Sequence, residues 1–168
     1  INPQYMLEVY SNEKDEQIYQ VFKDNPNVKY MGSVPYTQGQ KRMSQSDITV
    51  IVEGFEEKDI NLSRYSLSTK AADALASGSS ILTYGSMESG IIEYMQTTGA
   101  SMVCTERNRL IECIKILMAD QKLQKQYYEQ AIVMTKKNHN LEASCTISEQ
   151  VILGAINKMK CKNDMRKK

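Results

Sequence analysis

The stretch Tyr65-Ser-Leu-Ser-Thr-Lys-Ala-Ala-Asp-Ala-Leu-Ala-Ser-Gly-Ser-Ser-Ile-Leu-Thr-Tyr-Gly85 decides the fold of this 168-residue chain. It predicts a helix that begins among hydroxyl residues and ends at Gly78, followed directly by a buried strand over 80–84. At about 100° per residue, such a helix has one polar and one apolar face. The polar face holds Ser66, Thr69, Lys70, Asp73 and Ser77, and the apolar face holds Leu67, Ala71, Ala74, Leu75 and Gly78. The apolar face is expected to pack on a sheet.

The start of this predicted helix is a candidate anion site. Its first N–H groups have no partner within the helix, and the peptide dipole is positive there. That end suits a phosphate, and a carboxylate further along, at Asp73, suits ribose hydroxyls. In the alternative interpretation, Ser66 or Ser68 is only an N-cap and Asp73 is a solvated polar-face residue. Lys70 and Asp73 lie on the same face as the cap, which favours the first interpretation.

Composition excludes several classes of function. The net charge is +1, tryptophan is absent and phenylalanine occurs twice, so no nucleic-acid surface is expected. The four cysteines are widely spaced and His139 is the single histidine, which predicts neither a metal site nor a disulfide framework. No apolar run approaches the roughly 20 residues of a membrane span, and no secretory signal opens the chain. We expect a cytoplasmic protein with reduced thiols.

Strands and helices alternate about five times along the chain, which predicts a parallel sheet with helices on both faces. The expected fold is a three-layer, Rossmann-like α/β domain over 1–160, with a C-terminal helical tail and a basic end at 161–168. The abrupt start, without methionine, suggests a piece of something longer. Strands are predicted over 5–10, 28–31, 47–52, 80–84 and 100–104, helices over 15–22, 40–45, 66–78 and 90–95, and a polar loop over 53–64.

Only helices are predicted after residue 104, each with an apolar stripe that is interpreted as core. The stripes are Leu110, Ile111, Ile114 and Leu117, then Leu123, Tyr127, Ala131 and Met134, then Ile147, Val151, Ile152, Ala155 and Met159. In parallel sheets, ligands bind beyond the carboxyl ends of the strands. The loops 32–36, 53–69 and 85–90 should therefore meet at one edge.

With its elements in this order, the chain resembles the C-terminal, donor-binding half of bacterial GT-B glycosyltransferases of the group 1, or family 4, type. The similar segments are Asn25-Pro-Asn-Val-Lys-Tyr-Met-Gly-Ser-Val-Pro-Tyr36, Ser46-Asp-Ile-Thr-Val50, Ser66 to Gly78 with Ile81 to Gly85, Glu93-Tyr94, and Lys137-Asn-His-Asn-Leu-Glu142. The ordered set covers nearly the whole chain. The family's first strand of this half and its N-terminal domain have no counterpart in the sequence.

The resemblance implies a sugar transfer from a nucleotide-diphosphate donor to a saccharide or lipid-linked acceptor, without a bound metal or another cofactor. Ser66, Leu67, Ser68, Thr69 and Lys70 would hold the diphosphate, and Asp73 would bind the ribose. Tyr65 stands where many relatives have a sugar-contacting glutamate, and no catalytic residue is assigned. By the same resemblance, four residues would border the base: Gly32, Ser33, Val34 and Tyr36.

Other interpretations stay open. The chain could be a non-catalytic nucleotide-binding or partner-docking module of degenerate glycosyltransferase origin. A receiver-like domain fits poorly because Asp47 begins its strand instead of ending it. His139 is interpreted as structural, and the carboxylates over 53–59 as a solvated loop in preference to an acid–base pair. The basic tail is either a solubilising end or a peripheral contact with an anionic membrane surface.

Overall fold

The computed structural model describes residues 5–12, 14 and 16–165, apart from the side chains of residues 17, 18 and 160–165. The chain divides into two compact units, Ile1–Asp47 and Ile48–Lys168. A single domain over 1–160 therefore stays a prediction. The end of the predicted basic tail, at 166–168, lies outside the described residues.

The first unit is a parallel strand pair with two helices. Leu7 lies opposite Val28 in the pair. The ring of Tyr30 contacts two aromatic side chains of the first helix, Tyr19 at 5.1 Å and Phe22 at 5.7 Å between centroids. These contacts hold that helix on the strand pair. The elements are β1 (Leu7–Val9), α1 (Glu16–Lys23), β2 (Val28–Tyr30) and α2 (Tyr36–Ser44).

The second unit is built on a three-stranded parallel sheet in the order β3-β4-β5. The central strand, β4, has four of its five residues buried, as its apolar sequence predicts. The elements are β3 (Ile48–Val52), α3 (Glu57–Ser63), α4 (Thr69–Ala76), β4 (Ser80–Tyr84), α5 (Gly90–Thr98), β5 (Met102–Cys104), the short 3-10 helix η1 (Arg107–Arg109), α6 (Leu110–Ala119), α7 (Gln121–Asn138) and α8 (Leu141–Met165).

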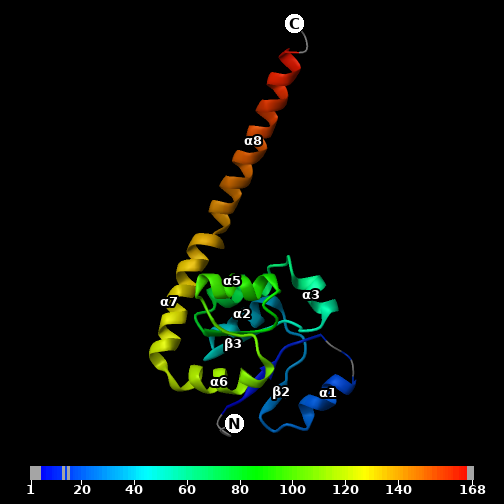
Figure 1. Ribbon diagram of the computed structural model, residues 1–168, viewed down its shortest axis with the longest axis vertical. Helices are drawn as coiled ribbons and strands as arrows, with labels where there is room; N and C mark the ends of the chain where they lie inside the picture. The colour runs from blue at the N-terminus through cyan, green and yellow to red at the C-terminus, as the bar shows by residue number, and fades with distance from the viewer. Residues whose placement is uncertain (1–4, 13, 15, 166–168) are drawn as a thin grey trace. The chain divides into compact units, whose positions relative to one another are not determined.

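Helices cover both faces of this sheet. Successive residues of β4 point to opposite faces, so Ile81 joins a core with α4 and α5, while Leu82 joins a core with α6. Figure 1 shows α5 and α6 on opposite sides of the sheet. The N-terminal part of α7 adds to the α6 core, through Leu123 and Tyr127, and its C-terminal part adds to the other core. The prediction of an α/β fold with helices on both faces is confirmed.

Helix α4 forms where the sequence predicts it, but it starts later. Ala71, Ala74 and Leu75 are almost fully buried against the sheet, as expected for the apolar face. Leu67 precedes the first turn and is 46% exposed, so its predicted burial is wrong. The reason is that α4 begins only at Thr69, so residues 66–68 do not share the periodicity of the helix.

Two segments that carry the family resemblance contact each other. The Tyr94 hydroxyl of α5 lies 3.0 Å from Nε2 of His139, which follows α7, and Asn138 donates a hydrogen bond to the same hydroxyl. Gly99 ends α5 in the left-handed conformation at φ 63°, which favours glycine. His139 thus links the C-terminal end of α7 to the middle of α5, in agreement with its structural interpretation.

Three expectations about the second unit are corrected. The segment predicted as a polar loop contains α3, because Glu57 and Asp59 suit the positive end of a helix dipole. Ile111 is exposed although its stripe partner Leu117 is fully buried. The stripe of α8 is not core: every described side chain of this helix is exposed. The reason is that a helical stripe predicts an apolar face, but not a neighbour for it.

Three described cysteines, Cys104, Cys113 and Cys145, are free thiols. Within the described part of the chain, no helix combines the length and the apolar character that crossing a bilayer requires.

Candidate functional site

The carboxyl ends of β3 and β4 lie directly against each other. Glu53 follows β3, and its backbone N–H donates to the carbonyl of Tyr84 at 2.8 Å. Gly85 follows β4, and a Cβ atom there would lie 2.8 Å from the Glu53 Cβ. A side chain at position 85 would therefore force the two strand ends apart. The close approach of the two strands explains why position 85 is occupied by glycine, which has no side chain.

The segment before α4 contacts the start of α5. A Cβ atom at Gly90 would lie 3.0 Å from the carbonyl oxygens of both Arg64 and Ser66. Arg64 also forms an ion pair with Glu88, with 2.6 Å between Nη2 and Oε2. Two of the three loops that were expected to meet, 53–69 and 85–90, are therefore brought together at the carboxyl edge of the sheet.

The start of α4 presents polar groups at this edge. Ser68 occupies the N-cap position, yet its side chain makes no capping hydrogen bond. Ser66, Thr69 and Lys70 are exposed, and Asp73 is half-buried on the second turn. The first N–H groups of α4 are thus left without the side-chain cap that the alternative interpretation expects from Ser68.

The charge of Lys70 acts on the Glu53 carboxyl. Partial burial raises the pKa of the Glu53 carboxyl above its usual value, and the charge of Lys70 lowers it in part. This interaction connects the end of β3 with the first turn of α4. Lys70 itself places a positive charge in the first turn of α4.

An aromatic–cation cluster at the same edge was missed from the sequence. The ring of Phe55 lies 5.0 Å from that of Tyr84 between centroids, and the Arg107 guanidinium lies 5.1 Å from the Phe55 centroid. Each of these residues ends its strand or follows it within three positions. Their places at or just after strand ends were the signal by which the sequence could have revealed the cluster. The carboxyl ends of parallel strands meet at one edge of the sheet.

One acidic residue at the start of α3 forms an exposed ion pair. Glu56 pairs with Lys58 at 3.1 Å, and both side chains are well exposed. Among the described residues, no group of three or more His, Cys, Asp or Glu side chains could hold a metal ion.

The residues predicted to border the base belong to the first unit. Gly32 follows β2 with φ 69°, and its carbonyl accepts a hydrogen bond from the Ser11 N–H at 3.2 Å. Ser33 is exposed and Val34 is half-buried. Tyr36 begins α2, is 65% exposed, and its hydroxyl accepts a hydrogen bond from Gln40 at 2.8 Å. All four lie beyond the carboxyl end of β2.

Comparison with known proteins gives a likeness in structure alone. No protein-family model matches this sequence, and no curated protein matches it either. Among solved structures, the chain is similar to the crystal structure of WaaG, a glycosyltransferase involved in lipopolysaccharide biosynthesis, with a TM-score of 0.58 and 17% sequence identity. The match covers 78% of this chain and 34% of WaaG, so the chain spans about a third of that protein. The chain has an α/β, Rossmann-like fold of the kind found in a GT-B glycosyltransferase.

Proposed function

We propose that this chain is the nucleotide-diphosphate-sugar-binding part of a glycosyltransferase that transfers a sugar to a saccharide or lipid-linked acceptor. One observation carries the proposal: the start of α4 lies at the carboxyl edge of a parallel sheet, with no side-chain cap from Ser68 and with Lys70 in its first turn. Anionic ligands bind at such helix starts. The fold likeness to WaaG supports the same class of protein.

In this proposal, backbone N–H groups and hydroxyls over 66–69 bind the diphosphate, and Lys70 neutralises part of its charge. Asp73, one turn further along α4, accepts hydrogen bonds from the ribose hydroxyls. Gly32, Ser33, Val34 and Tyr36 border the base. The acceptor would be held by a further domain, because orienting two substrates requires both walls of a cleft.

A calorimetric titration with uridine diphosphate and with guanosine diphosphate tests the binding site. We expect weak binding of at least one of them, and a loss of about tenfold or more in Lys70→Ala, because hydrogen bonds to charged groups contribute about 1.5–3 kcal/mol. Lys115→Ala is the matched control, since Lys115 is an exposed lysine of α6. Equal affinities of the two variants, or no binding of either nucleotide, would contradict the proposal.

A second function is favoured by one residue. Tyr65 stands where the resemblance places a sugar-contacting glutamate, and it is 94% exposed. A neutral phenol lacks the negative charge with which a carboxylate accepts hydrogen bonds from sugar hydroxyls, and this difference favours a nucleotide-binding module without transferase activity. A sugar-transfer assay of the longest natural form of the protein separates the two: turnover from the matching donor supports the enzyme, and binding without turnover supports the module.

A further inference from the structure

Arg107 is an exposed cation that is held at the carboxyl edge of the three-stranded sheet. It belongs to η1, which follows β5, yet its Cζ atom lies 5.1 Å from the ring centroid of Phe55, which follows β3. Phe55 in turn packs on Tyr84, the last residue of the central strand, with 5.0 Å between the ring centroids. The extensions of the two outer strands therefore meet beyond the end of the central strand.

The guanidinium of Arg107 has no oxygen acceptor within the described part of the chain, where it forms neither a hydrogen bond nor an ion pair. A cation–π contact orients a guanidinium but supplies none of its five N–H groups with an acceptor. Arg109 of the same short helix is different, because its Nε lies 3.3 Å from Oε2 of Glu112. Arg107 is thus a positioned cation whose donors are open to a ligand.

The Arg107 cluster and the start of α4 lie on opposite sides of the sheet edge. Alternate residues of a strand point to opposite faces. The Tyr84 side chain packs on the core that contains α6, which places its ring contacts on that side. Gly85 points to the other face, where a Cβ atom would lie 3.1 Å from Cδ1 of Ile92 in α5. The segment before α4 contacts the start of α5, so the candidate diphosphate site is on the α5 side.

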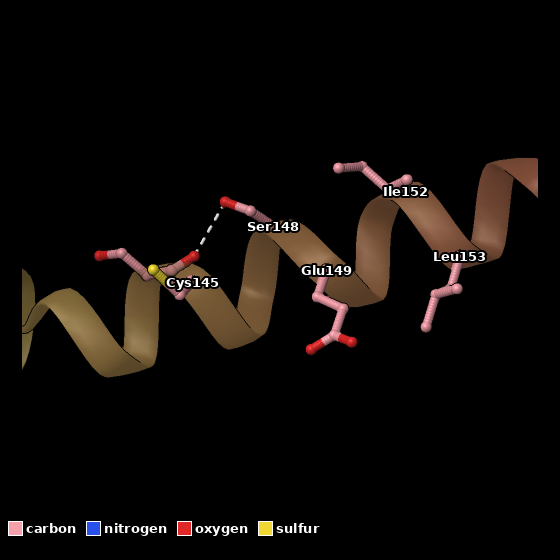
Figure 2. A pocket seen from close by; sticks show the side chains of 6 residues that line it. Cys145, Ser148, Glu149, Ile152 and Leu153 are labelled. Atoms are coloured by element: carbon pink, nitrogen blue, oxygen red, sulfur yellow. Dashed lines mark hydrogen bonds between the residues drawn. The ribbon is translucent and has the colours of Figure 1, made fainter.

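The charges around Arg107 suit an anion. Two carboxylates beside η1, those of Glu112 and Glu106, interact with Arg109. The shallow hollow on α8 is a contrasting surface. Figure 2 shows that it is lined by residues of α8 alone, and its one charged side chain is Glu149. A carboxylate in that setting repels an anion, whereas a guanidinium with open donors attracts one.

We propose that Arg107 is an oxyanion-binding residue on the α6 side of the sheet edge. Its planar set of N–H groups donates two parallel hydrogen bonds to a phosphate or carboxylate group, and the Phe55 ring holds the guanidinium in place. The site lies apart from the start of α4, so its ligand is an anion other than the diphosphate proposed there. The inference uses no residue of that nucleotide site and stands independently of the proposed function.

Matched small ligands test the site. Glucose 6-phosphate and glucuronate carry a phosphate and a carboxylate on closely related sugars, and glucose is the neutral control. Two-dimensional nitrogen–proton spectra of the full chain follow the side-chain Nε–Hε signals of the arginines. We expect the Arg107 signal to shift with at least one of the anions, to ignore glucose, and to shift equally in excess uridine diphosphate. The anion that acts at the lower concentration identifies the ligand group.

Two arginine variants measure the contribution of the guanidinium. Arg107→Gln should weaken binding of that anion about tenfold or more, because hydrogen bonds between charged groups are the strong ones. Arg109→Gln is the matched control: it removes the same charge from the same short helix, but from an arginine that already has a carboxylate partner. It should change the affinity far less. Arg107→Lys keeps the charge without the paired donors and should restore only part of the binding.

Equal losses in Arg107→Gln and Arg109→Gln, or an Arg107 signal that neither anion shifts, would overturn the proposal. Release of the anion by uridine diphosphate would also overturn it, since the anion would then share the site at the start of α4. None of these results bears on Lys70→Ala, whose effect on nucleotide affinity tests the proposed function separately.

Discussion

Helices α4 and α8 have similar apolar content and opposite surroundings. Ala71, Ala74 and Leu75 of α4 are almost fully buried in a core with residues of the sheet and of α7, while the described side chains of α8 are exposed. Both helices show an apolar stripe, so the stripe alone does not say whether a helix belongs to the core. Helix α4 connects β3 to β4 and therefore lies on their sheet.

The largest expected difference between the two helices is in the stability lost when one apolar side chain of each is shortened to alanine. Leu75 is 1% exposed, so Leu75→Ala should lower the free energy of unfolding by about 2–5 kcal/mol through loss of burial and a cavity. Ile152→Ala in α8 should change it by about 0.5 kcal/mol or less, because the side chain already faces water. Urea denaturation followed by circular dichroism measures both. Similar losses in the two variants would mean that α8 packs on the body of the protein.

A pair of glycine substitutions sharpens the contrast at the backbone. Gly85→Ala should destabilise the fold by about 1–3 kcal/mol, because its methyl group would press on the Glu53 Cβ and backbone. A Cβ atom added at Gly154 would have no other atom within 4 Å. Gly154→Ala should therefore raise the helicity of α8, since alanine favours a helix by about 1 kcal/mol over glycine. Thermal unfolding and the far-ultraviolet signal measure the two effects. A neutral Gly85→Ala would refute the close approach of the two strand ends.

The capping of α7 gives a smaller effect. The Asp120 carboxylate accepts hydrogen bonds from the N–H groups of Lys122 and Leu123, both at 3.0 Å. Asp120→Ala should therefore cost about 1 kcal/mol of stability, whereas Asp120→Asn should largely retain it. Chemical denaturation compares the variants. Equal stability of the alanine variant and the wild type would show that the cap does not contribute.

The smallest expected effect is a pH dependence from Glu53. Its pKa in the folded protein is raised, mainly by burial, so the folded state holds this proton more tightly than the unfolded state does. The resulting stabilisation is present below the unfolded pKa and is lost as the pH rises through the folded pKa. Glu53→Gln should flatten this part of the stability profile, while Ile152→Ala should follow the wild type. An unchanged profile in Glu53→Gln would contradict the assigned burial.

The alternation of strands and helices could be predicted because each element carries its own local signal. Strand β4 forms where the apolar run over 80–84 predicts it. Helix α5 begins at Gly90 and ends before Gly99, as the sequence predicts. Helix α3 was missed because its short polar sequence has no apolar stripe, and only the acidic first turn marks it. The exposure of α8 could not be predicted, since burial depends on neighbours that the local pattern does not contain.

The sequence predicted those contacts of the candidate site that follow from the order and direction of the strands. The parallel arrangement brings the segments around Ser66 and Gly90 to one edge, as expected from strands that end together. The contact of Phe55 with Tyr84 and Arg107 depends on side-chain directions, which sequence spacing does not encode. The same holds for Glu53 beside Lys70.

The most direct test of the central claim follows the backbone amides during a titration with the nucleotide that binds. Two-dimensional nitrogen–proton spectra of the full chain report each amide separately. If the start of α4 binds the diphosphate, the largest shifts should occur over 66–70, with the amides of α8 unchanged. Shifts spread over α8, or bound nucleotide with the amides over 66–70 unmoved, would contradict the account.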